Sequence, residues 1–233
     1  GLVNAASGII QTSAGAGDVR GMSGYLINRG RVEIGPETVF TGMIEAAGGT
    51  FTGPLQIKDS VVLVTASPVE PTQLDLVGGG NQLLTDNLVN TILRINGTVS
   101  YGLARLTLPQ GVVNRGVLRL ESTAQDHLDR GSYLETIEGT LVNAAEGRIE
   151  AVLNKGGNRV IAGNVRNEGT IVVEPSITLV VRGTDPIFSQ ANGGIEAEGA
   201  FLLEAGQFDW TGGRLNGVVR VLNTGVLVAE GVT

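Results

Sequence analysis

A short repeated unit organises this chain. Its clearest copy occupies residues 140–150 and reads Thr-Leu-Val-Asn-Ala-Ala-Glu-Gly-Arg-Ile-Glu. The common content is an apolar residue, any residue, Asn, one to three residues, Gly and then an alternating run, and copies recur from residue 1 to residue 228. Internal repetition with a period in the twenties is typical of stacked architectures, so it constrains the fold more than any other feature.

The spacing of the repeated Asn gives the period. Asn4 and Asn28 are 24 residues apart, and so are Asn143 and Asn167, whereas Asn114 and Asn143 are 29 apart. Leucine-rich repeats have a similar period, but their Leu-x-x-Leu-x-Leu framework is absent here. Gly contributes 36 of the 233 residues, and each would cost a helix about 1 kcal/mol. The apolar runs are rich in the β-branched residues that strands favour.

These observations predict an all-β fold, a single-stranded parallel β-helix (β-solenoid) of roughly ten coils with about 24 residues each. Parallel connections are right-handed by strong default, so we expect a right-handed coil. Residues 1–233 are expected to form one solenoid domain. Because the chain begins and stops inside a repeat, we interpret it as a fragment of a longer repeat protein, with flanking repeats of the same chain as partners of its ends.

The repeated Asn residues are predicted to lie in turns, because Asn and Gly reach positive φ at low cost. Amide side chains at equivalent places in successive coils can also stack into a ladder. The predicted members of this structural turn ladder are Asn4, Asn28, Asn114, Asn143, Asn167 and Asn223.

Three stretches interrupt the repeat, at residues 58–87, 121–138 and 183–192. The first contains Pro68, Pro71 and three consecutive glycines, and we expect it to form loops around strands at 61–64 and 74–77. Residues 144–153 have some helical character, but Gly147 interrupts them and related copies read as strand. We therefore predict no helix there.

One cluster combines residue types suited to acid–base or metal chemistry, namely Asp126, His127 and Asp129. Two carboxylates and a His could hold a metal ion or move protons. The simpler interpretation is a solvated insertion loop, since a single His without a second one nearby makes zinc unfavourable. We predict no cofactor.

Two further features are candidates for a ligand surface. Glu150, Glu174 and Glu198 follow each other at 24 residues, which predicts an acidic row on one face and, at most, weak calcium binding. The simpler interpretation, which we favour, is that these residues lie on solvent-facing strand edges. Trp210 alternates with Phe208, so both point to the same side. Packing in the core is the expected role, and a platform for stacking sugars is the alternative.

Composition excludes several classes of partner. The net charge of -7 argues against nucleic acid, whose recognition needs a basic surface. No run approaches 18 apolar residues, so we expect no membrane insertion. The absence of Cys excludes disulfides and Cys-based zinc sites.

The chain resembles the β-helical repeat regions of large secreted or cell-surface bacterial proteins of the adhesin and autotransporter-passenger kind. The resemblance rests on Leu-Val-Asn-Ala-Ala-Glu-Gly at 141–147, Val-Arg-Asn-Glu-Gly at 165–169 and Phe-Asp-Trp-Thr-Gly-Gly at 208–213. It implies a parallel β-helix, export from the cell, and a rigid stalk or binding surface without catalysis. Its implied partners are host-surface or matrix glycans or proteins.

The alternative function is a carbohydrate-active β-helix, either a polysaccharide lyase or hydrolase-like enzyme, or a glycan-binding module. Such an enzyme would need Asp, Lys and Arg side chains that converge on one face. The sequence alone does not assemble such an array, so we predict that the protein is not an enzyme.

Overall fold

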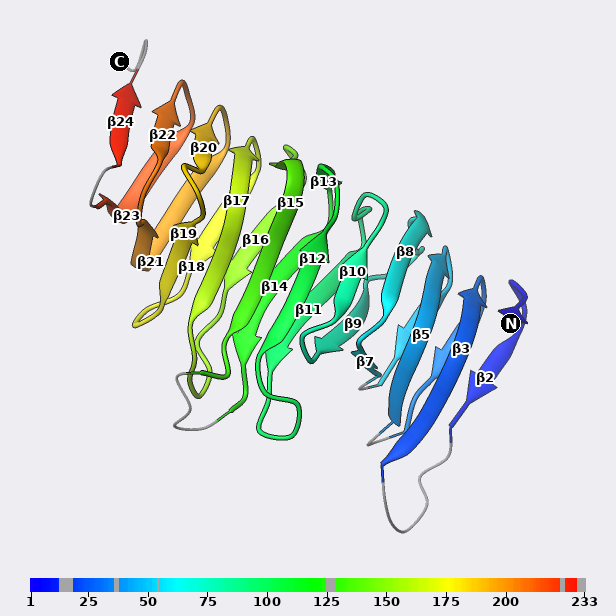
Figure 1. The fold of residues 1–233 in the computed structure, drawn as a ribbon. Coiled ribbons are helices and arrows are strands. Elements are labelled where there is room, and N and C mark those ends of the chain that lie inside the picture. The colour runs from blue at the N-terminus through cyan, green and yellow to red at the C-terminus, as the bar shows by residue number, and fades with distance from the viewer. Residues whose placement is uncertain (13–18, 36–37, 54, 125–128, 223–224, 230–233) are drawn as a thin grey trace.

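The chain folds into a stack of coils in the computed structural model, and its two ends lie at opposite ends of the stack (Figure 1). The structure describes residues 1–12, 19–35, 38–53, 55–124, 129–222 and 225–229. Within these ranges all regular structure is strand, and every ladder between the named strands is parallel. The predicted all-β solenoid of about ten turns is confirmed.

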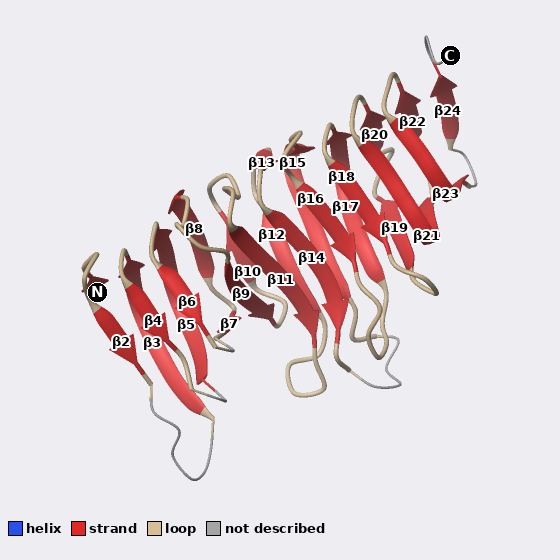
Figure 2. Cartoon of the chain, turned by 180° about the vertical axis from the view of Figure 1, so that it is seen from behind, coloured by secondary structure: helices blue, strands red, loops and turns tan. Residues whose placement is uncertain are grey.

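Each coil contributes strands to three columns of parallel pairs, so the solenoid has three faces (Figures 1 and 2). The chain visits face 1, then face 2, then face 3, and returns to face 1 one coil further along the stack. The pairing therefore gives three corners per coil.

The strands divide among the faces as follows. Face 1 holds β1 (Leu2–Asn4), β8 (Val61–Ala66), β10 (Asn81–Leu83), β13 (Val112–Asn114), β20 (Ile187–Gln190), β22 (Gln207–Trp210) and β24 (Val226–Ala229). Face 2 holds β2 (Ile9–Gln11), β4 (Arg31–Glu33), β6 (Thr50–Thr52), β11 (Thr91–Gly97), β14 (Val117–Ser122), β16 (Arg148–Ala151) and β18 (Thr170–Val173). Face 3 holds β7 (Gln56–Lys58), β12 (Ala104–Leu108) and β19 (Thr178–Arg182).

The remaining strands bend around a corner and serve two faces. Four of them pass from face 3 to face 1: β3 (Arg20–Asn28), β5 (Thr38–Ala47), β15 (Ser132–Asn143) and β17 (Arg159–Asn167). Two pass from face 2 to face 3, namely β21 (Gly194–Leu203) and β23 (Arg214–Val221). β9 (Thr72–Val77) pairs with β11 on face 2 and with β7 on face 3. β10 likewise pairs with β8 on face 1 and with β12 on face 3.

Apolar residues of successive coils stack in register to form the core. Face 2 carries two such runs, because β2, β4 and β6 form a sheet of their own. Val32 lies beside Phe51 in that sheet, and the longer run of the main sheet comprises Leu74, Leu93, Leu118, Ile149, Ile171 and Ile195. All are buried, because side chains alternate between the two sides of a strand and the inward side of every coil is closed by its neighbours. Burial of each such side chain contributes about 1.5–3 kcal/mol.

Aromatic residues fill the core near its C-terminal end. The ring centroid of Phe188 lies 4.9 Å from that of Phe201 and 5.2 Å from that of Phe208. All three rings are fully buried. The prediction that Phe208 packs in the core is confirmed, and Phe51 is also buried.

Coil length varies more than the predicted period of 24. Hydrogen bonds link residues of adjacent coils at separations of 18 residues (Gly42 to Ser60) and of 29 residues (Asn114 to Asn143). The strands expected at 61–64 and 74–77 are present in β8 and β9, and residues 148–151 form β16 rather than a helix.

Candidate functional site

The Asn residues of the repeat form a hydrogen-bonded column inside the solenoid, along the end of face 1. From Asn114 to Asn143 and from Asn143 to Asn167, each Nδ2 donates to the Oδ1 of the next coil, at 2.7 Å. Asn4 donates to Asn28 in the same way, at 2.8 Å. These amides are buried and out of reach of water, so the bonds to one another satisfy their donors and acceptors.

The column differs from the prediction in its conformation. Asn4, Asn28, Asn114, Asn143 and Asn167, the motif Asn residues that the structure describes, end strands in extended conformation, and none of these five has positive φ. The Gly that follows is needed for space: a Cβ at Gly147 would lie 2.2 Å from the carbonyl oxygen of Asn114 and 2.6 Å from Asn143 Oδ1. The predicted left-handed turn role is therefore wrong, because the Asn side chain points inward to bond the next coil and the sharp turn follows it.

The membership of the column also differs. Sequence reasoning missed Asn87, which donates to Asn114 at 2.7 Å, and Gln190, which accepts from Asn167 at 2.8 Å. After Asn28 the column is interrupted, because Ala46 is its partner in the next coil. Asn223 lies outside the described residues. Gln190 escaped detection because its strand lacks the Asn-x-Gly pattern, although its chemistry is the same.

The predicted acidic row does not form as a direct stack. Glu150 pairs in register with Val172, and Val172 with Glu196, so the residue beside Glu150 is apolar. The neighbouring coil is shorter than 24 residues at this point, which moves Glu174 past the end of the pairing. Glu174 instead accepts a hydrogen bond from the backbone N–H of Leu153 at 2.5 Å, and Glu198 is exposed.

A charged strip runs along the outer side of face 2, which the sequence analysis did not find. Arg94 on β11 is its centre: Nη1 lies 2.8 Å from Asp75 on β9, and Nε lies 2.7 Å from Glu121 on β14. One guanidinium thereby links three successive coils through two ion pairs. Both carboxylates are largely buried, and burial raises the pKa of Glu121, but hydrogen bonds from Arg94 and Asn154 outweigh it and hold that pKa below its usual range.

The strip continues with Glu150, which lies between two arginines. Arg119 Nε is 2.7 Å from Glu150 Oε2, and Arg148 Nε is 2.5 Å from Oε1. Burial alone would raise the pKa of Glu150, but the hydrogen bonds from Arg148 and Arg119 lower it overall. Because these carboxylates are ionised and neutralised by neighbouring cations, they are poorly suited to accept a proton at neutral pH.

The predicted acid–base cluster is only partly described. Asp126 and His127 lie outside the described residues, and Asp129 is exposed. Within the described ranges no group of three His, Cys, Asp or Glu residues could hold a metal ion.

Trp210 lies in the same column as the amides, one coil beyond Gln190. Its ring is partly buried and packs against the core, as the first of its two interpretations expected. Its indole Nε1 is enclosed and has no hydrogen-bond partner among the described residues. A hollow of about 550 Å³ lies beside the ring and is lined by Gly194, Ile195, Glu196, Gly213, Arg214, Leu215 and Asn216.

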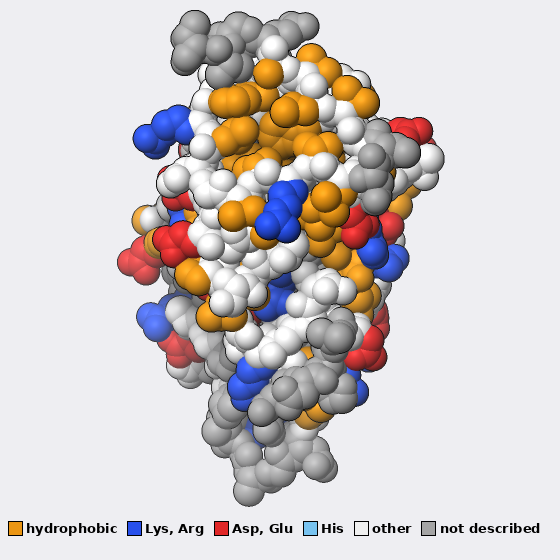
Figure 3. All heavy atoms as spheres, turned by 90° about the vertical axis from the view of Figure 1, so that its left-hand side faces the viewer, with side chains coloured by type: hydrophobic (Ala, Val, Ile, Leu, Met, Phe, Trp, Pro, Cys, Tyr) orange, Lys and Arg blue, Asp and Glu red, His pale blue; other side chains and the backbone are white. Residues whose placement is uncertain are grey.

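This hollow belongs to the C-terminal end of the stack. Hydrophobic side chains gather on that end of the molecule (Figure 3). Leu227 is 59% exposed, although it continues the column of Phe188 and Phe208, which are buried in the earlier coils. The hollow beside Trp210 is thus the uncovered end of the core rather than a cleft in a side wall.

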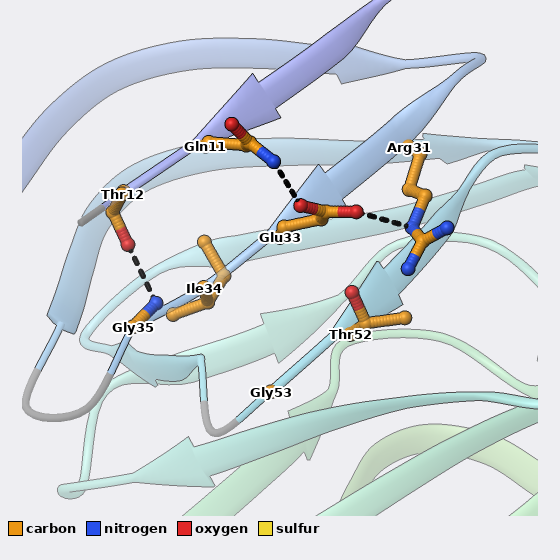
Figure 4. Close-up of a pocket in the computed structure, with 8 residues that line it drawn as sticks. All are labelled: Gln11, Thr12, Arg31, Glu33, Ile34, Gly35, Thr52 and Gly53. Atoms are coloured by element: carbon orange, nitrogen blue, oxygen red, sulfur yellow. Dashed lines mark hydrogen bonds and ion pairs between the residues drawn. The ribbon is translucent and has the colours of Figure 1, made fainter. Parts of the chain in front are cut away.

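A second hollow, of about 520 Å³, lies on face 2 at the other end of the stack (Figure 4). Its polar side chains bind one another. Glu33 accepts a hydrogen bond from Gln11 and pairs with Arg31 at 2.8 Å, while Thr12 Oγ1 accepts from the backbone N–H of Gly35 at 2.7 Å. Cross-strand pairs of this kind satisfy the face internally.

Comparison with family models, with curated proteins and with solved structures finds no match for this chain. No helix in the described part of the chain is long and apolar enough to span a membrane. Arguments about function therefore rest on the chain's own geometry.

Proposed function

We propose that this chain is a rigid solenoid segment of a secreted or cell-surface bacterial protein, which acts as a stalk or binding surface without catalysis. The observation that carries the proposal is the continuous parallel stack, in which interior amides and surface charges mostly bond to the neighbouring coils. Such cross-links resist bending and sliding of one coil against the next. Ten coils at about 4.8 Å each give a rod of roughly 50 Å.

The apolar end faces support flanking repeats of the same protein as partners. A solenoid coil buries its inward side chains only when another coil stacks on it. Leu227 at one end and Leu2 at the other are each more than half exposed, although their partners in the adjacent coil, Phe208 and Leu26, are buried. A further coil on either end would cover them in the same register as the coils within the chain.

Two measurements test the stalk proposal. In single-molecule pulling, the chain is expected to unfold in steps of whole coils, and Asn143→Ala is expected to weaken the central steps. In an activity screen with pectate, alginate, xylan and hyaluronan, we expect no turnover above that of the heat-unfolded chain. Turnover that Glu150→Gln abolishes would overturn the proposal in favour of a carbohydrate-active enzyme.

Localisation has its own test. Antibodies raised against this chain are expected to label intact cells of the organism that encodes it, and permeabilisation should add little signal. Labelling that requires permeabilisation would contradict export. An antibody against a cytosolic protein of the same cells serves as the control.

A further inference from the structure

A hollow in the side of the solenoid lies at the corner where face 3 turns into face 1. Its volume is about 400 Å³, within the range of small-molecule sites. Three successive coils line it, with Glu135, Thr136, Ile137 and Gly139 from the first, Ala162, Gly163 and Asn164 from the second, and Gly183, Thr184 and Pro186 from the third. Unlike the hollow beside Trp210, it has coils on both sides of it in the stack.

An irregularity in β15 creates this space. The register between β15 and β17 shifts between Glu135 and Thr140, so extra residues bulge outward at the corner. Small residues then keep the hollow open. Gly163 has a φ of 109°, and a Cβ added there would lie 2.7 Å from the carbonyl oxygen of Thr136. A larger residue at this position would force the corner apart.

The polar groups of the hollow match the hydroxyls of a sugar. Glu135 offers carboxylate oxygens as acceptors, and Arg105 holds it at 3.2 Å. Asn164 Oδ1 accepts a hydrogen bond from the backbone N–H of Ile187 at 2.9 Å, whereas Asn164 Nδ2 donates to no described residue. Thr136 is buried, and its hydroxyl is enclosed beneath the hollow without a partner in the described ranges. Thr184 adds an exposed hydroxyl, which can donate and accept.

Apolar groups lie beside these polar ones. Ile137 is 60% exposed, and the ring of Pro186 forms part of the wall. Sugar rings present C–H groups as well as hydroxyls, so a mixed lining of this kind suits them better than it suits a purely polar ion. The exposed Ile137 also gains from being covered, because burying apolar surface releases about 25 cal/mol per Å².

The charge around the hollow selects among saccharides. Arg182 stacks on the ring of Tyr133 at 5.2 Å and donates to its hydroxyl at 3.3 Å, at the rim formed by β15 and β19. Arg105 pairs with Glu135, whereas Glu138 and Asp185 are exposed next to lining residues. Three carboxylates against two guanidiniums leave a local excess of negative charge, which disfavours an acidic sugar.

We propose that this corner hollow binds one neutral hexose unit of a glycan, and that it is a lateral binding site of the stalk. The assignment rests on the proposed function for its biological meaning, although the binding itself does not. Glu135 accepts hydrogen bonds from sugar hydroxyls, and the Thr184 hydroxyl accepts or donates. Asn164 Nδ2 donates, and Ile137 and Pro186 contact the C–H face of the ring.

The test is saturation-transfer NMR and calorimetry with glucose, galactose, N-acetylglucosamine, cellobiose and lactose as probes, and glucuronic acid for comparison. We expect at least one neutral probe to bind. Glu135→Gln and Thr184→Ala should each weaken that binding, Glu135→Gln by about tenfold, because a hydrogen bond to a charged group is lost. Glu33→Gln, in the hollow of Figure 4, is the matched carboxylate control and should change nothing.

Three results would overturn the assignment. One is the absence of transfer to every neutral probe, and another is tighter binding of glucuronic acid than of glucose. The third is binding that survives Glu135→Gln and Thr184→Ala in variants whose circular dichroism matches the parent chain. None of these results affects the stalk proposal, which pulling and turnover measurements judge separately.

Discussion

Replacing Asn143 by Ala should destabilise the chain by about 3 kcal/mol. Asn143 is fully buried, accepts from Asn114 Nδ2 at 2.7 Å, and donates to Asn167 Oδ1 at 2.7 Å and to the carbonyl of Thr170 at 3.3 Å. Ala removes three bonds with a net value of about 1 kcal/mol each. Asn114 Nδ2 keeps its bond to the carbonyl of Arg148, but Asn167 Oδ1 loses its only described donor.

The measurement is urea unfolding followed by circular dichroism, in which the slope of the transition also shows whether the array still unfolds as one unit. Asn4→Ala is the informative comparison. Asn4 also donates to Asn28 and to the carbonyl of Arg31, but no described residue donates to its Oδ1. We expect it to cost about 1–2 kcal/mol, since fewer groups lose a partner.

Asn192→Ala is the surface control, because its side chain is exposed in the loop before β21. Its effect should stay within about 0.5 kcal/mol. If Asn143→Ala costs no more than Asn192→Ala, the column does not stabilise the stack and the reasoning from its hydrogen bonds is wrong.

Four further predictions follow from the packing and the charges. Arg94→Met leaves two largely buried carboxylates without their cation, so it should lower the free energy of unfolding in urea by about 3–5 kcal/mol. A decrease below about 1 kcal/mol would contradict this. Phe188→Ala opens the aromatic cluster and should cost about 3–5 kcal/mol. Because the folded pKa of Glu150 is lowered, its contribution is present above the unfolded value of about 4.3 and is lost as pH falls through the folded value. In Glu150→Gln, the free energy of unfolding measured in urea should therefore decrease less between neutral and acidic pH than it does in the parent chain. Val226→Lys should weaken concentration-dependent association seen by light scattering, whereas a strict monomer at all concentrations in the parent chain would oppose that idea.

The sequence was sufficient to predict the class of fold, for physical reasons. Alternating apolar residues bounded by Gly can bury only one side of a short strand, and repetition then demands stacking. The inward positions of Phe51 and Phe208 follow from the same alternation. These features are local, so they can be read without knowing which coils touch.

Features that depend on register could not be predicted from a single average period. The Asp75–Arg94–Glu121 bridge joins residues 19 and 27 apart, neither of which is the mean spacing. The same variation places Val172 rather than Glu174 beside Glu150. The corner hollow depends on a bulge between Glu135 and Thr140. The interruption of the repeat at residues 121–138 overlaps this bulge but does not show where the register shifts.

The amide column has a direction. From Asn87 through Gln190 each amide donates only toward the C-terminal end, and Asn4 donates to Asn28 in the same sense. The amide dipoles therefore add along the axis, and each bond polarises the next. At the first member, Asn87 Oδ1 is buried and accepts nothing from the described residues, while Gln190 Nε2 at the last member turns to the carbonyl of Asn192. The rod therefore has a dipole along its axis. A coil inserted with its amide reversed would place one amide donor against another.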